Sequence, residues 1–326
     1  MVMQASLALP APTASEHGRA RQPDETGVVV RDGVRVAWER YGDGEPTILL
    51  MPTWSIFPSR HWKFQIGDLA RYFRVVTFDG RGNGRSDRPD RITAYADTEF
   101  AGDAVAVLDA ARVDRAVLAG LSMGAGYAIR TVVEHPDRVL GLVLIGSSIA
   151  VLDRPPDAPA DPGPDRDFED PRPPEADDGW GRYNAHFWRR DWAGFLSWFV
   201  GTRIFSETHS TKHVEDGIGW GLETDAETII ATERAPFLRP PDGWPVRPPT
   251  EGRAVAFVRR VRCPALVIHG AEDRISPIEV GRRLARELDA PLVEIEGGGH
   301  APNLREPVLV NLLIRDFVRK LAGGPG

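Results

Sequence analysis

Ser122 is the residue of this sequence whose setting most clearly predicts chemistry. It is the centre of Gly120-Leu121-Ser122-Met123-Gly124, a G-x-S-x-G pattern between a predicted strand at 116–121 and a predicted helix at 124–134. Glycines two positions before and after the serine suit a sharp turn where strand and helix pass close together. A hydroxyl on such a turn lies at a helix N-terminus, where backbone N–H groups stabilise negative charge. The pattern therefore favours a nucleophilic serine over an incidental serine in a glycine-rich turn.

The elements around this turn alternate between strands and helices. Two continuous apolar runs, 47–51 and 73–77, predict strands that are buried on both faces. The alternation includes a helix at 103–111 and a strand at 139–145, and it resumes near the C-terminus. There we expect strands at 265–269 and 292–295 and helices at 277–288 and 308–321. This order predicts an α/β fold with a mostly parallel sheet and helices on both faces.

The predicted core has a leader before it and an insertion within it. The insertion begins with a segment rich in proline and acidic residues, 153–178, which suits neither a helix interior nor a central strand. An aromatic-rich helical region, about 180–237, follows, and a second proline-rich stretch closes it. We predict a disordered leader at 1–26, a core of 27–150 and 255–326, and an inserted helical cap at 151–254. Near the start, Asp32-Gly33 between two valine-rich runs predicts a β-hairpin.

Together these features resemble the α/β-hydrolase fold superfamily, over roughly residues 27–150 and 255–322. The resemblance implies a catalytic triad in the chain order Ser, acid, His. Asp273 takes the acid position in the segment 266–277, with Glu272 as its rival. His300, after three glycines, matches the catalytic-histidine loop. His300 would then take the proton of Ser122, Asp273 would orient the imidazole, and an acyl-enzyme would form.

An oxyanion hole is also implied by the resemblance. One donor should be the backbone N–H of Met123, directly after the nucleophile. The second should come from the loop after the strand at 47–51, where many members have His-Gly. This chain has Pro52-Thr53-Trp54 instead, and Pro52 has no N–H. We therefore expect Trp54 as the second donor, with Thr53 as the alternative.

A glycine-rich loop at 78–89 could be mistaken for a nucleotide-binding fingerprint. No helix opens directly after its glycines, and no acidic residue follows on a second strand. We interpret the loop as structural, with Asp79 and Arg81 bridging, and expect no cofactor. The histidines outside the triad lack metal-ligand spacing, so no metal is expected either.

Composition narrows the class of protein and its partners. A net charge of −7 over 326 residues, with scattered arginines, argues against nucleic acid as a partner. No apolar run approaches the ~18 residues of a membrane span. The single cysteine, Cys263, stands at the entry to a predicted buried strand, so we interpret it as a core residue rather than a reactive thiol. One cysteine fits a cytoplasmic protein.

The predicted cap bears on substrate. Its aromatic residues should pack first of all, but some should face the site; we expect Trp54, Trp188 and Trp192 to contact substrate. Such a pocket favours a small apolar or aromatic ester-type molecule. The leading hypothesis is a serine hydrolase acting on a carboxylic ester or lactone. Alternatives are C–C bond, iminopeptidase, thioesterase or perhydrolase chemistry on the same serine, or a non-catalytic ligand receptor.

Overall fold

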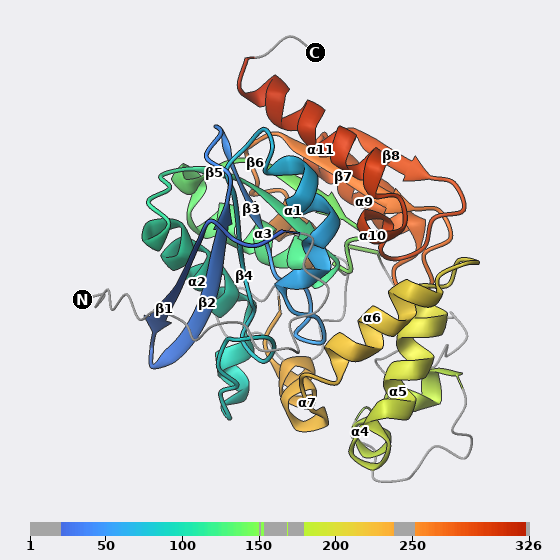
Figure 1. The fold of residues 1–326 in the computed structure, drawn as a ribbon. Coiled ribbons are helices and arrows are strands. Elements are labelled where there is room, and N and C mark those ends of the chain that lie inside the picture. Colours follow the sequence, from blue (N-terminus) through green and yellow to red (C-terminus); the bar gives the residue numbers. More distant parts are fainter. Residues whose placement is uncertain (1–20, 150, 153–167, 169–178, 238–251, 324–326) are drawn as a thin grey trace.

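A mostly parallel sheet forms the centre of the molecule (Figure 1). The computed structural model describes residues 21–149, 151–152, 168, 179–237 and 252–323. Eight strands of this part of the chain pair in the order β1-β2-β4-β3-β5-β6-β7-β8. β1 and β4 both pair antiparallel with β2, and the remaining pairs are parallel. The strands are β1 Glu25–Arg31, β2 Val34–Tyr41, β3 Thr47–Leu50, β4 Val75–Phe78, β5 Ala116–Leu121, β6 Val139–Ile145, β7 Ala265–Gly270 and β8 Leu292–Ile295. The predicted α/β fold class is confirmed.

The first two strands form the expected hairpin. Arg31 pairs with Val34, and the two residues between them, Asp32 and Gly33, have φ of 52° and 81°. Positive φ at both central positions defines the tight turn whose twist matches that of the flanking strands. β1 starts at Glu25, and the Asp24 N–H donates to the Arg40 carbonyl (2.9 Å), so residues 24–26 of the predicted leader belong to the hairpin. Residues 1–20 of the predicted leader lie outside the described residues.

Helices cover both faces of the sheet, as the pattern predicted. Alternate residues of one strand point to opposite faces, so Leu49 packs with α2, α3 and α9, while Ile48 and Leu50 pack with α1 and α11. The helices of the core are η1 Ser59–Trp62, α1 Lys63–Leu69, η2 Ile92–Tyr95, α2 Asp97–Ala110, α3 Met123–Glu134, η3 Pro136–Arg138, α8 Gly252–Val258, α9 Ile278–Leu288, α10 Pro302–Arg305 and α11 Pro307–Leu321. A buried layer of apolar side chains therefore packs against the strands on each face of the sheet.

A helical segment is inserted between β6 and β7 (Figure 1). Its elements are η4 Gly179–Arg182, α4 Ala185–Arg190, α5 Trp192–Phe199, the π-helical turn η5 Val200–Ile204, α6 Thr211–Gly221 and α7 Ala226–Arg234. Asn184, Asp191 and Asp225 cap α4, α5 and α7 by accepting backbone N–H bonds. The aromatic residues of these helices join the same hydrophobic cluster as α1 and α11. Most of the two proline-rich segments lies outside the described residues.

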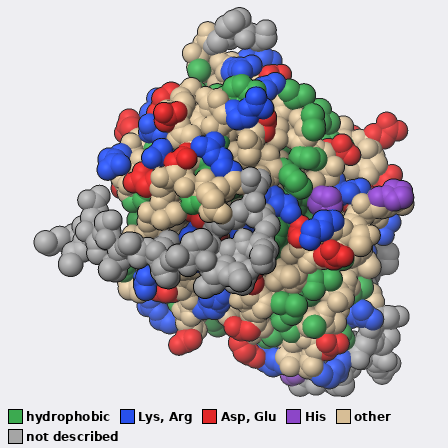
Figure 2. Space-filling model, viewed as in Figure 1, with side chains coloured by type: hydrophobic (Ala, Val, Ile, Leu, Met, Phe, Trp, Pro, Cys, Tyr) green, Lys and Arg blue, Asp and Glu red, His purple; other side chains and the backbone are tan. Residues whose placement is uncertain are grey.

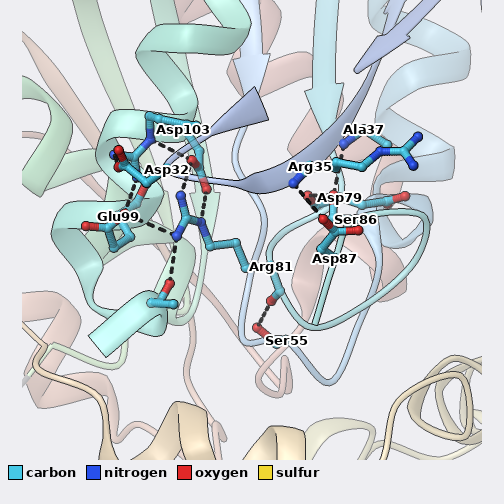
Figure 3. Close-up of polar contacts among 12 residues, drawn as sticks. Asp32, Arg35, Ala37, Ser55, Asp79, Arg81, Ser86, Asp87, Glu99 and Asp103 are labelled. Atoms are coloured by element: carbon cyan, nitrogen blue, oxygen red, sulfur yellow. Dashed lines mark hydrogen bonds and ion pairs between the residues drawn. The ribbon is translucent and has the colours of Figure 1, made fainter. Parts of the chain in front are cut away.

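The glycine-rich loop after β4 is structural, but the expected bridge between Asp79 and Arg81 is wrong. Arg81 is fully buried and donates from Nε and Nη2 to Asp103 on α2 (2.6 and 2.8 Å), with Glu99 3.1 Å from Nη1 (Figure 3). Asp79 instead accepts from the backbone N–H and hydroxyl of Ser59 (2.9 and 2.6 Å). The two side chains thus attach the loop to different elements, because each is buried beside a partner that is distant in sequence.

The surface is mixed in charge. On the face in Figure 2, Lys and Arg side chains lie interspersed with Asp and Glu, and hydrophobic side chains are scattered among them. No helix among the described residues is long and apolar enough to span a bilayer.

Candidate active site

Ser122 occupies a strained turn between β5 and α3. Its φ is 55° and its ψ is −119°, a conformation that residues with a Cβ rarely adopt. A Cβ at Gly120 would lie 2.3 Å from the carbonyl oxygen of Gly124, and one at Gly124 would lie 2.4 Å from the carbonyl oxygen of Pro52. The Ser122 N–H donates to the Ile145 carbonyl (2.9 Å), which fixes the turn on the neighbouring strand. The two glycines are therefore required by close backbone contacts.

Asp273 and His300 form a hydrogen-bonded pair. His300 Nδ1 lies 2.8 Å from Asp273 Oδ2, and the Asp273 side chain is fully buried. The backbone N–H groups of Ile275 and Ser276 donate to Oδ1 (2.8 and 2.9 Å). A carboxylate only accepts, so Nδ1 carries the proton and Nε2 keeps its lone pair. Glu272, the rival acid, uses its backbone N–H to hold the Gly298 carbonyl (2.9 Å).

The environment keeps Asp273 ionised. Burial by itself would raise its pKa, but the adjacent His300 and the hydrogen bonds from His269, His300 and the Ser276 N–H together hold that pKa well below its ordinary value. An ionised acid stabilises the imidazolium that forms when His300 takes a proton.

His269 is a further member of this cluster. It is fully buried at the end of β7, with Nε2 2.8 Å from the Ser276 carbonyl and 3.3 Å from Asp273 Oδ2. Because a carbonyl only accepts, Nε2 must be the protonated nitrogen. Its position directly before Gly270, where β7 enters the acid loop, was the only sequence signal. The proton of His269 Nε2 therefore lies between the Ser276 carbonyl and the acid.

Ser122 and His300 share one cavity of about 370 Å³. Trp54 lines it, as expected, but Trp188 and Trp192 do not. Their indole N–H groups donate to the Arg182 and Gly221 carbonyls (3.0 and 3.1 Å), within the packing of the insertion. The lining residues are Thr53, Trp54, Ile56, Phe57, Leu121, Ser122, Met123, Ser148, Trp180, Tyr183, Phe199, Ile204, Thr232, Glu233, Ala235, Phe237, Ile275 and His300. Trp180, Tyr183 and Phe199 thus take the places expected of the other two tryptophans.

The loop 52–54 lies directly beside the serine turn. The Thr53 hydroxyl donates to the Leu121 carbonyl (2.9 Å), and the Trp54 indole N–H donates to the Thr232 hydroxyl on α7 (2.7 Å). Trp54 also packs on Tyr183 and Phe199, with ring centroids 6.1 and 5.8 Å apart. Met123, Thr53 and Trp54 all line the cavity. The loop is therefore held from the sheet on one side and from the insertion on the other.

The remaining candidate residues show no separate chemistry. Burial raises the pKa of the Cys263 thiol to about 11, so it is neutral at physiological pH. Within the described parts of the chain, no three His, Cys, Asp or Glu side chains are grouped so that they could hold a metal ion.

Several known proteins are similar to this chain over most of its length. A 2-hydroxymuconate semialdehyde hydrolase from Pseudomonas sp. (strain CF600) is 27% identical over 303 residues, which cover 89% of this chain and 92% of that protein. The rhodomycin D methylesterase DauP from Streptomyces sp. (strain C5) is 27% identical over 85% of this chain and 92% of its own. The solved structure of Est816, described as an N-acyl homoserine lactone degrading enzyme, matches with a TM-score of 0.67 and 25% identity, over 89% of this chain and 99% of that one. The family model of the alpha/beta hydrolase fold matches residues 52–307, and the chain therefore belongs to that family.

Proposed function

We propose that the protein is a serine hydrolase that cleaves a carboxylic ester or lactone, with Ser122 as nucleophile, His300 as general base and Asp273 as the orienting acid. One observation carries the proposal. The hydrogen-bonded pair of His300 and ionised Asp273 opens onto the same cavity as a serine held at φ 55°. A buried histidine with its proton on Nδ1 is suited to accept a proton at Nε2 from a neighbouring hydroxyl.

The reaction follows from these roles. Ser122 Oγ attacks the carbonyl carbon as its proton passes to His300 Nε2, and the carbonyl oxygen becomes an oxyanion. The backbone N–H of Met123 and that of Trp54 or Thr53 stabilise the oxyanion. The tetrahedral intermediate collapses, the alcohol leaves with the proton from His300, and the acyl group stays on Ser122. Water, deprotonated by His300, then attacks the acyl-enzyme, and the acid is released as Ser122 Oγ leaves and takes the proton back from His300.

The cavity supports an apolar or aromatic substrate. Trp54, Trp180, Tyr183 and Phe199 line it together with aliphatic side chains, and its volume of about 370 Å³ suits a small molecule. The inserted helices supply most of these aromatic residues, so they act as a lid that selects substrate.

A second candidate is hydrolysis of a C–C bond by the same serine. It is favoured by the likeness to the 2-hydroxymuconate semialdehyde hydrolase. The likeness to the methylesterase and to the lactone-degrading enzyme instead favours hydrolysis of an ester or lactone. The two chemistries share the nucleophile and differ in the leaving group, which is a carbanion in one case and an alkoxide in the other.

Short p-nitrophenyl esters test the proposal. We expect the wild-type protein to hydrolyse them and to react with a fluorophosphonate probe, and Ser122→Ala to lose both activities. Full turnover by Ser122→Ala would show that the serine mechanism is wrong. A panel of aryl esters, lactones and vinylogous diketones, compared by kcat/KM, then separates the two candidate reactions.

A further inference from the structure

Glu207, in the loop between η5 and α6, contacts the backbone of the histidine loop. Its Oε1 accepts the N–H of Gly299 (2.8 Å), the residue directly before His300. The approach is close, because a Cβ at Gly299 would lie 2.9 Å from the Glu207 carboxyl carbon. The other oxygen, Oε2, is buried without a hydrogen-bond partner among the described residues. Glu207 is only partly buried, but leaving one of its oxygens buried without a hydrogen bond has an energetic cost.

The chain around Glu207 is held tightly against the element that follows His300. Arg305, at the end of α10, donates from Nη2 to the Thr208 carbonyl (2.8 Å) and from Nη1 to the His209 carbonyl (3.2 Å). The start of α6 accordingly lies beside α10 (Figure 1). His209 has φ 62°, a strained value for a residue with a side chain, and the Ser210 hydroxyl donates to the Glu207 carbonyl (2.7 Å). This turn therefore contacts the chain on both sides of His300.

The histidine loop needs such support. Gly297, Gly298 and Gly299 have no side chains to pack, and ordering glycines costs more backbone entropy than ordering other residues. The loop passes over Gly270, where a Cβ would lie 2.2 Å from the Gly299 carbonyl oxygen. On the core side, the Glu272 N–H holds the Gly298 carbonyl (2.9 Å). Glu207 adds a charge-assisted hydrogen bond from the inserted helices, one residue from the imidazole.

We propose that Glu207 is a positioning residue that couples the inserted helices to His300 and fixes the orientation of its imidazole toward Ser122. The role rests on the proposed serine-hydrolase function. A carboxylate at this position holds the Gly299 amide, which sets the backbone from which the His300 ring extends to Asp273. The bond therefore links the inserted helices directly to the backbone of the residue before the base.

Kinetics of two Glu207 variants test the role. Glu207→Ala removes the acceptor and should lower kcat on p-nitrophenyl esters by about tenfold or more, with KM within about twofold, because a small misplacement of a catalytic group lowers the rate of the chemical step. Glu207→Gln keeps an oxygen acceptor and should restore kcat to within about threefold of wild type. Glu215→Ala, which removes an exposed carboxylate from neighbouring α6, is the control and should leave kcat unchanged.

A spectroscopic measurement separates positioning from general stability. The downfield proton resonance of His300 Nδ1–H reports its hydrogen bond to Asp273; it should shift or broaden in Glu207→Ala and persist in Glu207→Gln and Glu215→Ala. Unchanged kcat and an unchanged resonance in Glu207→Ala would overturn the proposal. So would a loss of kcat accompanied by a lowered Tm that Glu207→Gln does not rescue, since that pattern indicates a purely structural role.

Fluorophosphonate labelling distinguishes this proposal from the function on which it rests. A wild-type protein that is not labelled refutes the serine-hydrolase function, and the positioning role with it. A labelled wild type together with a Glu207→Ala variant that is labelled at the same rate refutes the positioning role alone.

Discussion

Replacement of Asp273 by asparagine should disable the enzyme while leaving its shape intact. The carboxylate accepts two hydrogen bonds at Oδ1 from backbone N–H groups and one at Oδ2 from His300, and His269 Nε2 lies 3.3 Å from Oδ2. In Asp273→Asn the amide oxygen must stay with the two backbone donors, so the amide NH₂ faces both imidazoles. His300 Nδ1 then becomes an acceptor, and the proton moves to Nε2, where it points at Ser122.

The expected loss of kcat follows from the wrong tautomer of His300. A base that carries its proton on the reacting nitrogen cannot accept another, and a loss of about 10⁴-fold in kcat is expected from this change alone. That factor corresponds to about 5.5 kcal/mol of transition-state stabilisation. Because the asparagine fills the same space, KM for a p-nitrophenyl ester should change little.

Steady-state hydrolysis of p-nitrophenyl butyrate measures kcat and KM for Asp273→Asn. Asp316→Asn, an exposed position on α11, is the control for loss of one carboxylate. Glu272→Gln tests the rival acid and should keep nearly all activity. Near wild-type kcat in Asp273→Asn, or a severe loss in Glu272→Gln, would refute the assignment of the acid.

Three further predictions concern the surrounding framework. Gly120→Ala places a Cβ 2.3 Å from the Gly124 carbonyl oxygen, and thermal or urea unfolding should show a loss of about 1–3 kcal/mol together with lost activity; unchanged stability would contradict the contact. Trp54→Phe removes the indole bond to Thr232 and should lower the free energy of unfolding by about 1–3 kcal/mol, because the buried hydroxyl loses a donor; an unaltered urea midpoint argues against it. Burial raises the pKa of the Asp79 carboxyl group, but a neighbouring arginine and hydrogen bonds outweigh burial, so this pKa is lower in the folded protein than in the unfolded chain. The ionised carboxylate therefore stabilises the fold at pH values above the pKa of the unfolded state. This stabilisation is lost as the pH falls through the pKa of the folded state. The difference in unfolding free energy between wild type and Asp79→Asn should thus shrink from pH 7 to pH 3; a constant difference would contradict the ionised state.

Local chemical signals explain what the sequence predicted well. Asp32-Gly33 specifies its turn because both positions require positive φ, and the serine turn is recognisable because Gly120 and Gly124 must lack a Cβ. Apolar residues at alternate positions or in continuous runs predict the strands β3 to β8, because a strand buried on one or both faces requires apolar residues on those faces.

Partners distant along the chain were much harder to predict. Arg81 was paired with the wrong acid, because Asp103 becomes its neighbour only when α2 packs against the sheet. The aromatic residues of the insertion are similar in type, and only the angles between its helices decide that Trp180 and Tyr183 face the cavity while Trp188 faces the interior of the insertion.

The sequence by itself determined the fold class, the serine turn and the candidate acid and base, because each is encoded in a few adjacent residues under strict steric or hydrogen-bonding requirements. Only the tertiary structure decided that His269 donates toward Asp273 and that Glu207 holds the Gly299 amide, 92 residues away along the chain. Such contacts depend on how separately encoded elements pack together, and no local pattern of residue types specifies the packing of one element against another.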